Sequence, residues 1–181
     1  MGPEYSVAFV FQQVEAALAE DLHAFWRLHQ AAYHAELRRF RLTAQRREPL
    51  AQPGRPLRRQ TAAVARGGSG QVVGVVLVVL RELNPDLHLG THAYFQRMYV
   101  DPKVRSPRLA NQLYKTFLKG FDGAKVERDH RAGVLMSDNI NPGLQRSFMR
   151  RYFARLGFVM LGSNQLGGEV WSRRLATKFV L

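Results

Sequence analysis

The sequence predicts a single α/β domain, residues 1–181, with a mixed sheet at its centre. The length of 181 residues suits one domain with one hydrophobic core. The hydrophobic fraction of 46% is ordinary for a globular chain and too high for a disordered one. Strand-like and helix-like patterns also alternate along the chain. Their order is strand, helix, hairpin, strand, helix, strand, helix, strand, strand.

The strands are predicted from short apolar segments that are rich in β-branched and aromatic residues. Glycine-rich or proline-containing turns separate several of them, and the turn at residues 67–70 closes a hairpin. The predicted strands are residues 5–11, 61–65, 72–83, 94–100, 132–136, 158–161 and 169–173.

Two helices are predicted from apolar residues that recur at intervals of three and four. The first covers residues 14–40, with Leu28 on its apolar face, and a break is expected near residues 29–33. The second covers residues 108–121 and is amphipathic. Its apolar side chains at steps of four are Leu109, Leu113, Phe117 and Phe121.

A third helix is predicted to start near Pro142, because proline is tolerated in the first turn of a helix. Gly157 is the residue expected to end it. Its expected apolar stripe consists of Leu144, Phe148, Tyr152 and Leu156. Between the first helix and the second strand, residues 41–60 are basic and proline-rich and are predicted to form a loop, either functional or a solvated insertion.

The net charge of +13 favours an anionic partner. Nucleic acid, an acidic carrier protein, anionic lipid and a phosphorylated cofactor all fit such a charge. The chain has no cysteine, which excludes disulfides, thiolate zinc sites and a cysteine nucleophile. The longest apolar run, residues 72–80, is too short to span a membrane, and no signal peptide is visible. We therefore expect a cytoplasmic protein.

Several common catalytic patterns do not occur in the sequence. The six histidines lack metal-ligand spacing with carboxylates, so no metal site is predicted. No nucleophile elbow or Walker loop is found. The glycines at residues 67–70 precede a strand and not a helix, which argues against a dinucleotide fingerprint.

Two segments resemble the GNAT superfamily of N-acyltransferases. The segment RMYVDPKVRSPRLANQLYKTFL, residues 97–118, resembles the family's central motif through Val100, Pro102 and Arg105. The segment NPGLQRSFMRRYFARLGF, residues 141–158, resembles the second signature, a helix that ends in Leu-Gly-Phe. The two motifs occur in the family's order.

The resemblance implies a mixed, mostly antiparallel sheet of six or seven strands, with helices on both faces and a splayed central pair of strands. It also implies transfer of an acyl group from acetyl-CoA or another acyl-CoA to an amine, on a small molecule or a protein. The turn before the second helix would bind the cofactor's pyrophosphate, since a helix N-terminus favours anions. The implied cofactor-binding residues are Met98, Tyr99, Val100, Arg105, Ser106, Arg108, Leu109, Ala110 and Asn141.

The sequence departs from the family pattern at two places. Arg108 stands where glycine is usual, and Pro107 lacks an N–H group, so the phosphate cradle loses one donor. Many members have a tyrosine where this chain has Phe153; that tyrosine protonates the leaving thiolate. Tyr152 is adjacent, but one step turns it ~100° around a helix. It can replace the tyrosine only if the helix is rotated or bulged.

A second resemblance involves RLHQAAYHAEL, residues 27–37, in the first helix. It is similar to the N-terminal signature of acyl-homoserine-lactone synthases and long-chain N-acyl amino acid synthases. These relatives use acyl carrier protein, whose phosphopantetheine is the alternative donor here. A third hypothesis is a non-catalytic GNAT domain that binds nucleic acid or protein through its basic surface.

Acyl transfer to an amine needs a base that removes the amine's proton. Glu36, Glu82 and His92 are the candidate bases, and Tyr152 is the candidate acid. For Asn139 and Asn141, placed after the 132–136 strand, the resemblance implies contact with pantetheine or substrate. Helix capping is the alternative and suits Asn141.

Overall fold

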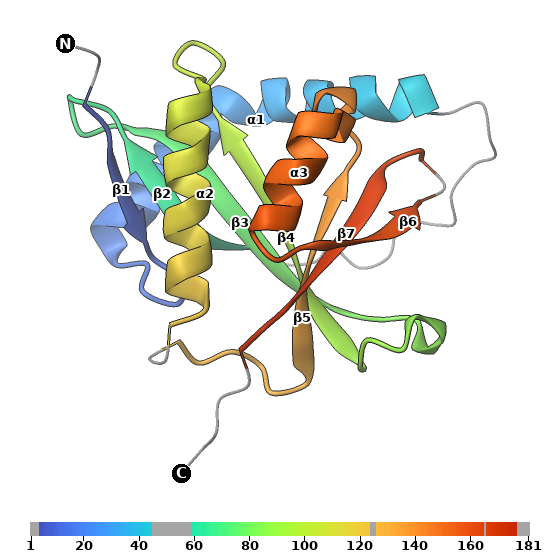
Figure 1. Ribbon diagram of the computed structural model, residues 1–181. Helices are drawn as coiled ribbons and strands as arrows, with labels where there is room; N and C mark the ends of the chain where they lie inside the picture. Colours follow the sequence, from blue (N-terminus) through green and yellow to red (C-terminus); the bar gives the residue numbers. More distant parts are fainter. Residues whose placement is uncertain (1–3, 45–58, 124–125, 165, 177–181) are drawn as a thin grey trace. The chain divides into compact units, whose positions relative to one another are not determined.

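The computed structural model describes residues 4–44, 59–123, 126–164 and 166–176. Seven strands and three α-helices are found in this part of the chain (Figure 1). The elements are β1 (Ser6–Phe9), α1 (Ala16–Ala44), β2 (Gln60–Arg66), β3 (Val72–Glu82), β4 (His92–Val100), α2 (Pro107–Phe121), β5 (Ala132–Asn139), α3 (Ser147–Arg155), β6 (Val159–Ser163) and β7 (Glu169–Arg174). Two short 3₁₀ turns, η1 (Pro85–Leu87) and η2 (Pro142–Gln145), complete the order.

The strands form one mixed sheet in the order β1-β2-β3-β4-β5-β7-β6. β4 and β5 pair in parallel, and the pairs β1–β2, β2–β3, β5–β7 and β6–β7 are antiparallel. This confirms the predicted mixed, mostly antiparallel sheet of six or seven strands. The parallel register runs from His92 opposite Ala132 to Gln96 opposite Ser137. The expected splaying of these two strands stays a prediction.

The backbone groups into two compact units. The first contains Met1–Tyr33, Arg59–Val78 and Arg97–Glu127; the second contains His34–Arg58, Val79–Gln96 and Arg128–Leu181. The boundary between them passes through α1, β3 and β4. Whether the chain folds as one domain, as the sequence predicts, stays a prediction.

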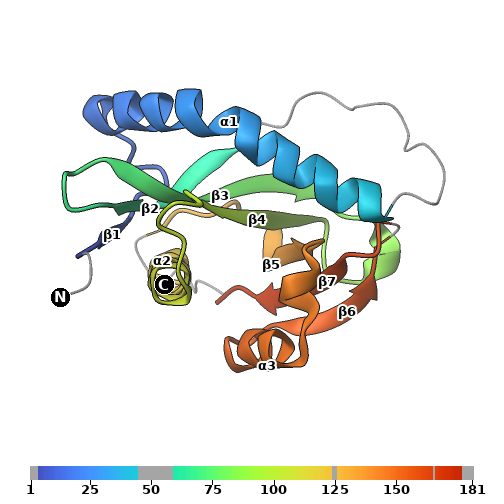
Figure 2. The ribbon, with the colours of Figure 1, turned by 90° about the horizontal axis from the view of Figure 1, so that it is seen from above.

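The core of the first unit lies between α2 and the strands β1 and β2. The predicted stripe of α2 is confirmed, since Leu109, Leu113, Phe117 and Phe121 are all 0% exposed. Close approach of helix and strand depends on Gly120, because a Cβ built there would lie 2.2 Å from Phe9 Cγ. In this unit, the first half of α1 and α2 lie on opposite faces of the strands (Figure 2).

Helix α1 differs from the prediction in two respects. It continues without interruption through residues 29–33, so the expected break is wrong. Leu28, expected on the apolar face, is 79% exposed. The buried face is formed by Leu22, Phe25 and Tyr33, and steps of ~100° place Leu28 well away from it.

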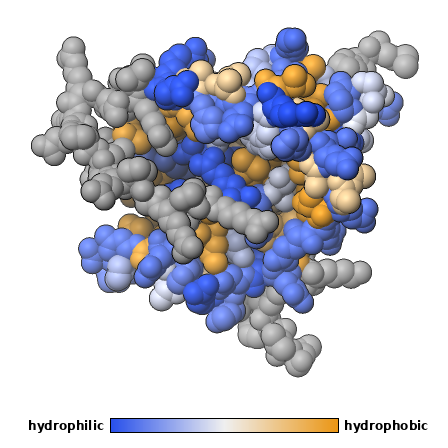
Figure 3. Space-filling view, turned by 180° about the vertical axis from the view of Figure 1, so that it is seen from behind, coloured by the Kyte–Doolittle hydropathy of each residue, from blue (hydrophilic) through white to orange (hydrophobic). Residues whose placement is uncertain are grey.

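The predicted bounds of the loop, residues 41–60, are wrong at both ends. The helix extends to Ala44 and β2 begins at Gln60, so both ends of the predicted loop belong to regular elements. Residues 45–58 lie outside the described residues. No helix in the described ranges is long and apolar enough to cross a membrane. Figure 3 shows a face on which hydrophilic residues predominate and apolar residues form small, separate patches.

The third helix also differs from the prediction. Pro142 begins the 3₁₀ turn η2, and α3 begins five residues later, at Ser147. Arg146 between them has extended backbone (φ −68°, ψ 150°), which interrupts the helical register. The predicted apolar stripe is therefore wrong. Phe148 is 53% exposed, and the buried residue of α3 is Phe153, whose ring lies between Phe158 and Trp171.

Candidate functional site

The connection from β4 to α2 is a compact turn held by its own side chains. Asp101 accepts two backbone hydrogen bonds, from Lys103 N to its Oδ1 at 2.9 Å and from Val104 N to its carbonyl oxygen at 3.1 Å. Ser106 then caps α2, since its Oγ accepts from Leu109 N at 3.2 Å. The helix therefore begins at Pro107, one residue before the predicted start.

Arg105 connects this turn to the end of β4. Its Nε and Nη2 donate to the carbonyl oxygen of Val100 at 3.2 and 3.0 Å. Its guanidinium also lies 5.7 Å from the centre of the Tyr99 ring, a cation–π distance. Arg105 therefore positions the turn, and the Val100 carbonyl expected to contact pantetheine already accepts hydrogen bonds from within the chain.

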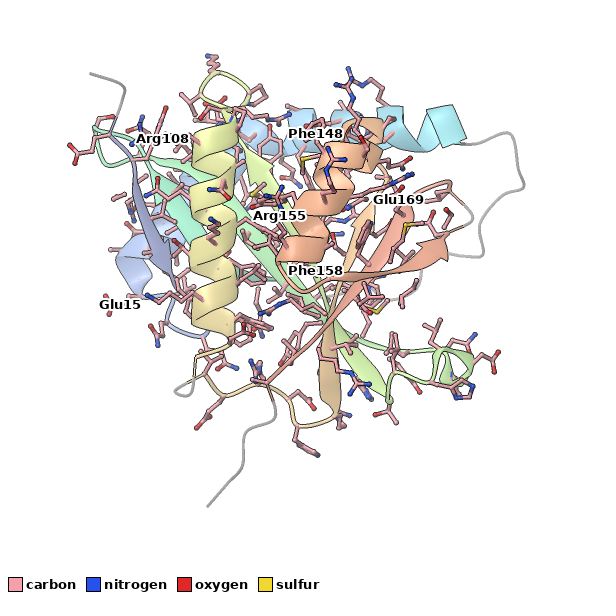
Figure 4. All side chains as sticks on the ribbon, in the orientation of Figure 1. Glu15, Arg108, Phe148, Arg155, Phe158 and Glu169 are labelled. Carbon is pink, nitrogen blue, oxygen red and sulfur yellow. The ribbon has the colours of Figure 1, made fainter. Side chains whose placement is uncertain are left out.

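The backbone donors at the start of α2 are partly used. The N–H of Leu109 is bonded to Ser106 Oγ and that of Ala110 to the Ser106 carbonyl oxygen, while Leu109 has its side chain in the core. Among the described residues, the N–H groups of Ser106 and Arg108 have no partner from the chain. Arg108 is exposed in the first turn (Figure 4). These two amides and the Arg108 guanidinium are the groups that this turn offers to an anion.

Aromatic side chains of α1 hold the end of β4 in place. The buried Tyr99 ring lies 6.1, 6.0 and 5.4 Å from the rings of Phe25, Trp26 and Tyr33. His29 Nε2 lies 3.9 Å from Asp101 Oδ2. In the first unit, then, α1 supports the turn that carries the candidate phosphate-binding groups. Met98, also predicted for the cofactor, is 38% exposed on the same strand.

In the second unit, Asn139 ends β5 with an unsatisfied amide. The side chain is 3% exposed, and its Oδ1 accepts from Ser137 Oγ at 2.9 Å. Its Nδ2 is buried and has no hydrogen-bond partner within the described part of the chain. A buried donor without a partner costs roughly 1–3 kcal/mol, so such a group calls for an explanation such as a ligand. The prediction that Asn139 follows the strand is wrong, because β5 extends three residues beyond the predicted end at Met136 and Asn139 is its last residue.

Asn141 has the capping role that the sequence offered as the alternative. It is the N-cap of η2, and its Oδ1 accepts from Gly143 N at 2.9 Å. A contact between Asn141 and a cofactor stays a prediction.

A buried carboxylate that the sequence did not single out lies opposite Asn139. Glu169 pairs with Asn139 in the β5–β7 register and is 3% exposed. Its Oε1 accepts from Arg150 Nε at 2.7 Å, and its Oε2 accepts from Trp171 Nε1 at 3.2 Å. The sequence could have indicated this burial, because side chains alternate between the two faces of a strand. Glu169 therefore lies on the same face of β7 as the buried Trp171. A glutamate at the start of a strand is otherwise interpreted as exposed.

The candidate catalytic residues come from separate elements. Glu36 is half-buried on α1, and Glu82 is exposed at the end of β3. His92 begins β4, where its Nδ1 lies 3.0 Å from Thr91 Oγ1. Tyr152 is half-buried on α3, and burial raises the pKa of its hydroxyl. Their catalytic roles stay predictions.

Comparison with solved structures identifies the fold. No protein-family model and no curated protein matches the chain. An acetyltransferase of the GNAT family from Streptococcus pneumoniae aligns with a TM-score of 0.51 at 10% identity, covering 96% of this chain and 100% of that one. The fold is the GNAT fold. A chain of the KacTA–DNA complex aligns with a TM-score of 0.50 at 13% identity, covering 95% and 94%.

The segment that resembles the second signature ends α3 in the expected way. Gly157 has the positive φ of 81° that suits a glycine after a helix, so the Leu-Gly-Phe ending is a helix stop. The ring of Phe153, which the resemblance places at the family's tyrosine position, is 6.0 Å from that of Phe158 and 5.6 Å from that of Trp171. Tyr152, one residue earlier on α3, is half-buried, and its ring lies 5.8 Å from that of Phe153.

Proposed function

We propose that this protein transfers an acyl group from the pantetheine thioester of an acyl-CoA to an amine. The observation that carries the proposal is the connection between β4 and α2. A strand that pairs in parallel with β5 leads into a tight turn and then into a serine-capped helix start with an exposed arginine. This is the element with which the GNAT resemblance associates cofactor binding.

The donor groups of this turn fit a phosphorylated cofactor. The amides of Ser106 and Arg108 have no partner within the described chain, and the helix dipole adds partial positive charge. Arg108 can add a charge-assisted contact to a phosphate oxygen. In the second unit, the buried Nδ2 of Asn139 is a further hydrogen-bond donor that a ligand oxygen could satisfy.

The chemistry requires two proton transfers by groups of this chain. The thioester supplies an activated acyl carbon; as the C–N bond forms and the C–S bond breaks, the amine loses a proton and the sulfur gains one. Glu36 and Glu82 are the proposed acceptors of the amine's proton. Tyr152 is the proposed donor to the sulfur, since a tyrosine hydroxyl is protonated at neutral pH and burial raises the pKa of this one further.

A carrier-protein donor is the second candidate function, and a specific observation favours it. Pro107 has no N–H, and the N–H groups of Leu109 and Ala110 bond to Ser106. Few amides are left for a pyrophosphate. A carrier protein presents its pantetheine arm on a single phosphate and has no nucleotide to be held.

Calorimetry with acetyl-CoA, a long-chain acyl-CoA and an acyl carrier protein tests the proposal. We expect saturable binding of an acyl-CoA, weakened by Arg108→Ala and unchanged by Arg38→Ala, a matched charge removal on α1. Tight binding of the carrier protein alone would select the second candidate. If no thioester binds, the enzymatic proposal is wrong; nucleic-acid binding with a steep salt dependence and no thioester turnover would then select the non-catalytic alternative.

A further inference from the structure

The segment around α3 has an unusual charge distribution. Between Asp138 and Glu169 the sequence contains four arginines and no acidic residue. These arginines are Arg146, Arg150, Arg151 and Arg155. All four lie on or next to α3 and are exposed. The helix therefore carries concentrated positive charge with no acidic residue of its own.

Within the described residues, one of these four arginines has an acidic partner. Arg150 pairs with the buried Glu169. In the described ranges no carboxylate pairs with Arg146, Arg151 or Arg155. The positive charge of these three side chains is thus available to a partner. It is also costly to keep together without one, because like charges at i, i+4 destabilise a helix.

The outward face of α3 combines this charge with an exposed aromatic ring. At ~100° per residue, Phe148, Arg151 and Arg155 fall within an arc of ~60° on the side opposite the buried Phe153. Phe148 is 53% exposed. Figure 4 shows Phe148 near the start of α3 and Arg155 at its end. The three side chains form a stripe ~10 Å long, since a helix rises ~1.5 Å per residue.

We infer that this stripe of Phe148, Arg151 and Arg155 binds single-stranded nucleic acid. Guanidinium groups bind phosphates in a bidentate manner and also stack on bases. An exposed aromatic ring next to a basic track is the arrangement on which unpaired bases stack. The net charge of +13 favours the same polyanion at long range.

Other anionic partners fit the stripe less well. An anionic membrane surface is bound by helices with several large apolar side chains on one face, and this face has only Phe148. An acidic protein surface would be satisfied by charge alone and gives no role to the phenyl ring. Because this inference concerns a surface of the second unit, it does not rest on the acyltransferase proposal.

Fluorescence anisotropy with a labelled single-stranded RNA oligonucleotide tests the inference on the full chain. We expect Arg151→Ala/Arg155→Ala to weaken binding at least tenfold and to lower the salt slope by about 1.4, since each neutralised phosphate contributes ~0.7 in single strands. Phe148→Ala should weaken binding about tenfold with no change in slope. Lys115→Ala/Lys119→Ala removes the same charge at the same spacing from exposed positions of α2 and should have a much smaller effect.

Three results would overturn the inference. The first is no oligonucleotide binding by the wild type, or an equal loss in the α2 control. The second is α3-dependent binding of an acidic carrier protein or of anionic lipid vesicles without binding of the oligonucleotide. The third is a loss of acyl-CoA affinity in Arg151→Ala/Arg155→Ala as large as the loss of oligonucleotide affinity. That result would show that the stripe binds the acyl donor. Arg151→Lys/Arg155→Lys keeps the charge, and partial rescue by it excludes misfolding as the cause.

Discussion

Arg150 on α3 donates from Nε to Oε1 of Glu169 on β7 at 2.7 Å, and Glu169 is 4% exposed at its side chain while Arg150 is 51% exposed. The carboxylate is therefore buried and the guanidinium is at the surface. A buried carboxylate is tolerated only when it is paired and hydrogen-bonded. This contact attaches α3 to β7. The other carboxylate oxygen of Glu169 accepts a hydrogen bond from Trp171 within the same strand.

Replacing Arg150 should destabilise the protein more than replacing its neighbour. Arg150→Ala leaves Glu169 buried without a counter-charge, and we expect a loss of about 2 kcal/mol in the free energy of unfolding, less than for a fully buried pair because Arg150 is half exposed. Arg151→Ala removes the same charge from the same helix but breaks no ion pair, so it should change stability by less than about 0.5 kcal/mol. Urea unfolding monitored by circular dichroism measures both. Equal effects would show that the ion pair contributes nothing.

The Arg150–Glu169 pair is a contact that the sequence does not predict. Apolar, β-prone segments and the turns between them located the seven described strands to within a few residues, and the regular apolar periodicity of α2 placed that helix to within one residue. It misplaced α3, because the extended backbone at Arg146 restarts the helical register and no residue type signals that break. The buried Glu169 was missed for a related reason: its partner is 19 positions away in the sequence.

The candidate phosphate turn was predictable in location but not in detail. Val100, Pro102 and Arg105 marked the turn correctly, since a proline after a strand and a serine before a helix act locally. The hydrogen bond from the Arg105 guanidinium to the Val100 carbonyl oxygen forms only in the folded turn. It cannot be inferred from the spacing of these residues in the sequence.

Gly120 should not accept a side chain. A Cβ at this position would lie 2.2 Å from Cγ and 2.7 Å from Cβ of Phe9, atoms near the root of that side chain that cannot easily move. We expect Gly120→Ala to destabilise by about 1–3 kcal/mol in spite of alanine's better helix propensity. Gly68→Ala is the control, because nothing lies within 4 Å of the added carbon. If Gly120→Ala stabilises the protein, α2 does not approach β1 this closely.

Asp129 should make stability depend on pH in the acidic range. Hydrogen bonds from the side chain and backbone of Arg131 hold the pKa of Asp129 well below its usual value. The stability that the ionised Asp129 carboxylate gives to the folded state is therefore fully present above its unfolded-state pKa of ~3.9. It is lost as the pH falls through the lower pKa of the folded state. Asp129→Asn should lower the melting temperature at neutral pH, and the difference from wild type should shrink at strongly acidic pH. A difference that is constant with pH would contradict this assignment.

Tyr152 can be tested separately as an acid and as a packing residue. If Tyr152 protonates the leaving sulfur, Tyr152→Phe should lower kcat about 100-fold or more with little change in the KM for the donor. Because burial raises the pKa of Tyr152 above its ordinary 10.0, wild-type activity should fall on the alkaline side only above that pH. Steady-state kinetics across pH measures both. If kcat of Tyr152→Phe falls by less than a few-fold, Tyr152 is not the acid and has only a packing role.

The two arginines of the turn should differ when they are replaced singly. Arg108 is exposed and offers its guanidinium to a phosphate, so Arg108→Ala should weaken donor binding by about 1.5–3 kcal/mol without changing the unfolding free energy much. Arg105 holds Val100 and contacts Tyr99, so Arg105→Ala should lower stability as well as affinity. Arg38→Ala/Arg39→Ala on α1 is the control for charge acting through a screened field, and it should cost far less binding free energy with an acyl-CoA donor.

With a carrier-protein donor, replacing Arg38 and Arg39 should instead slow association, because an acidic partner is steered by the whole basic surface. Calorimetry and stopped-flow at two salt concentrations, with both donors, distinguish these cases. If the Arg105→Ala/Arg108→Ala double variant binds every donor as well as the wild type does, this turn is not a phosphate site.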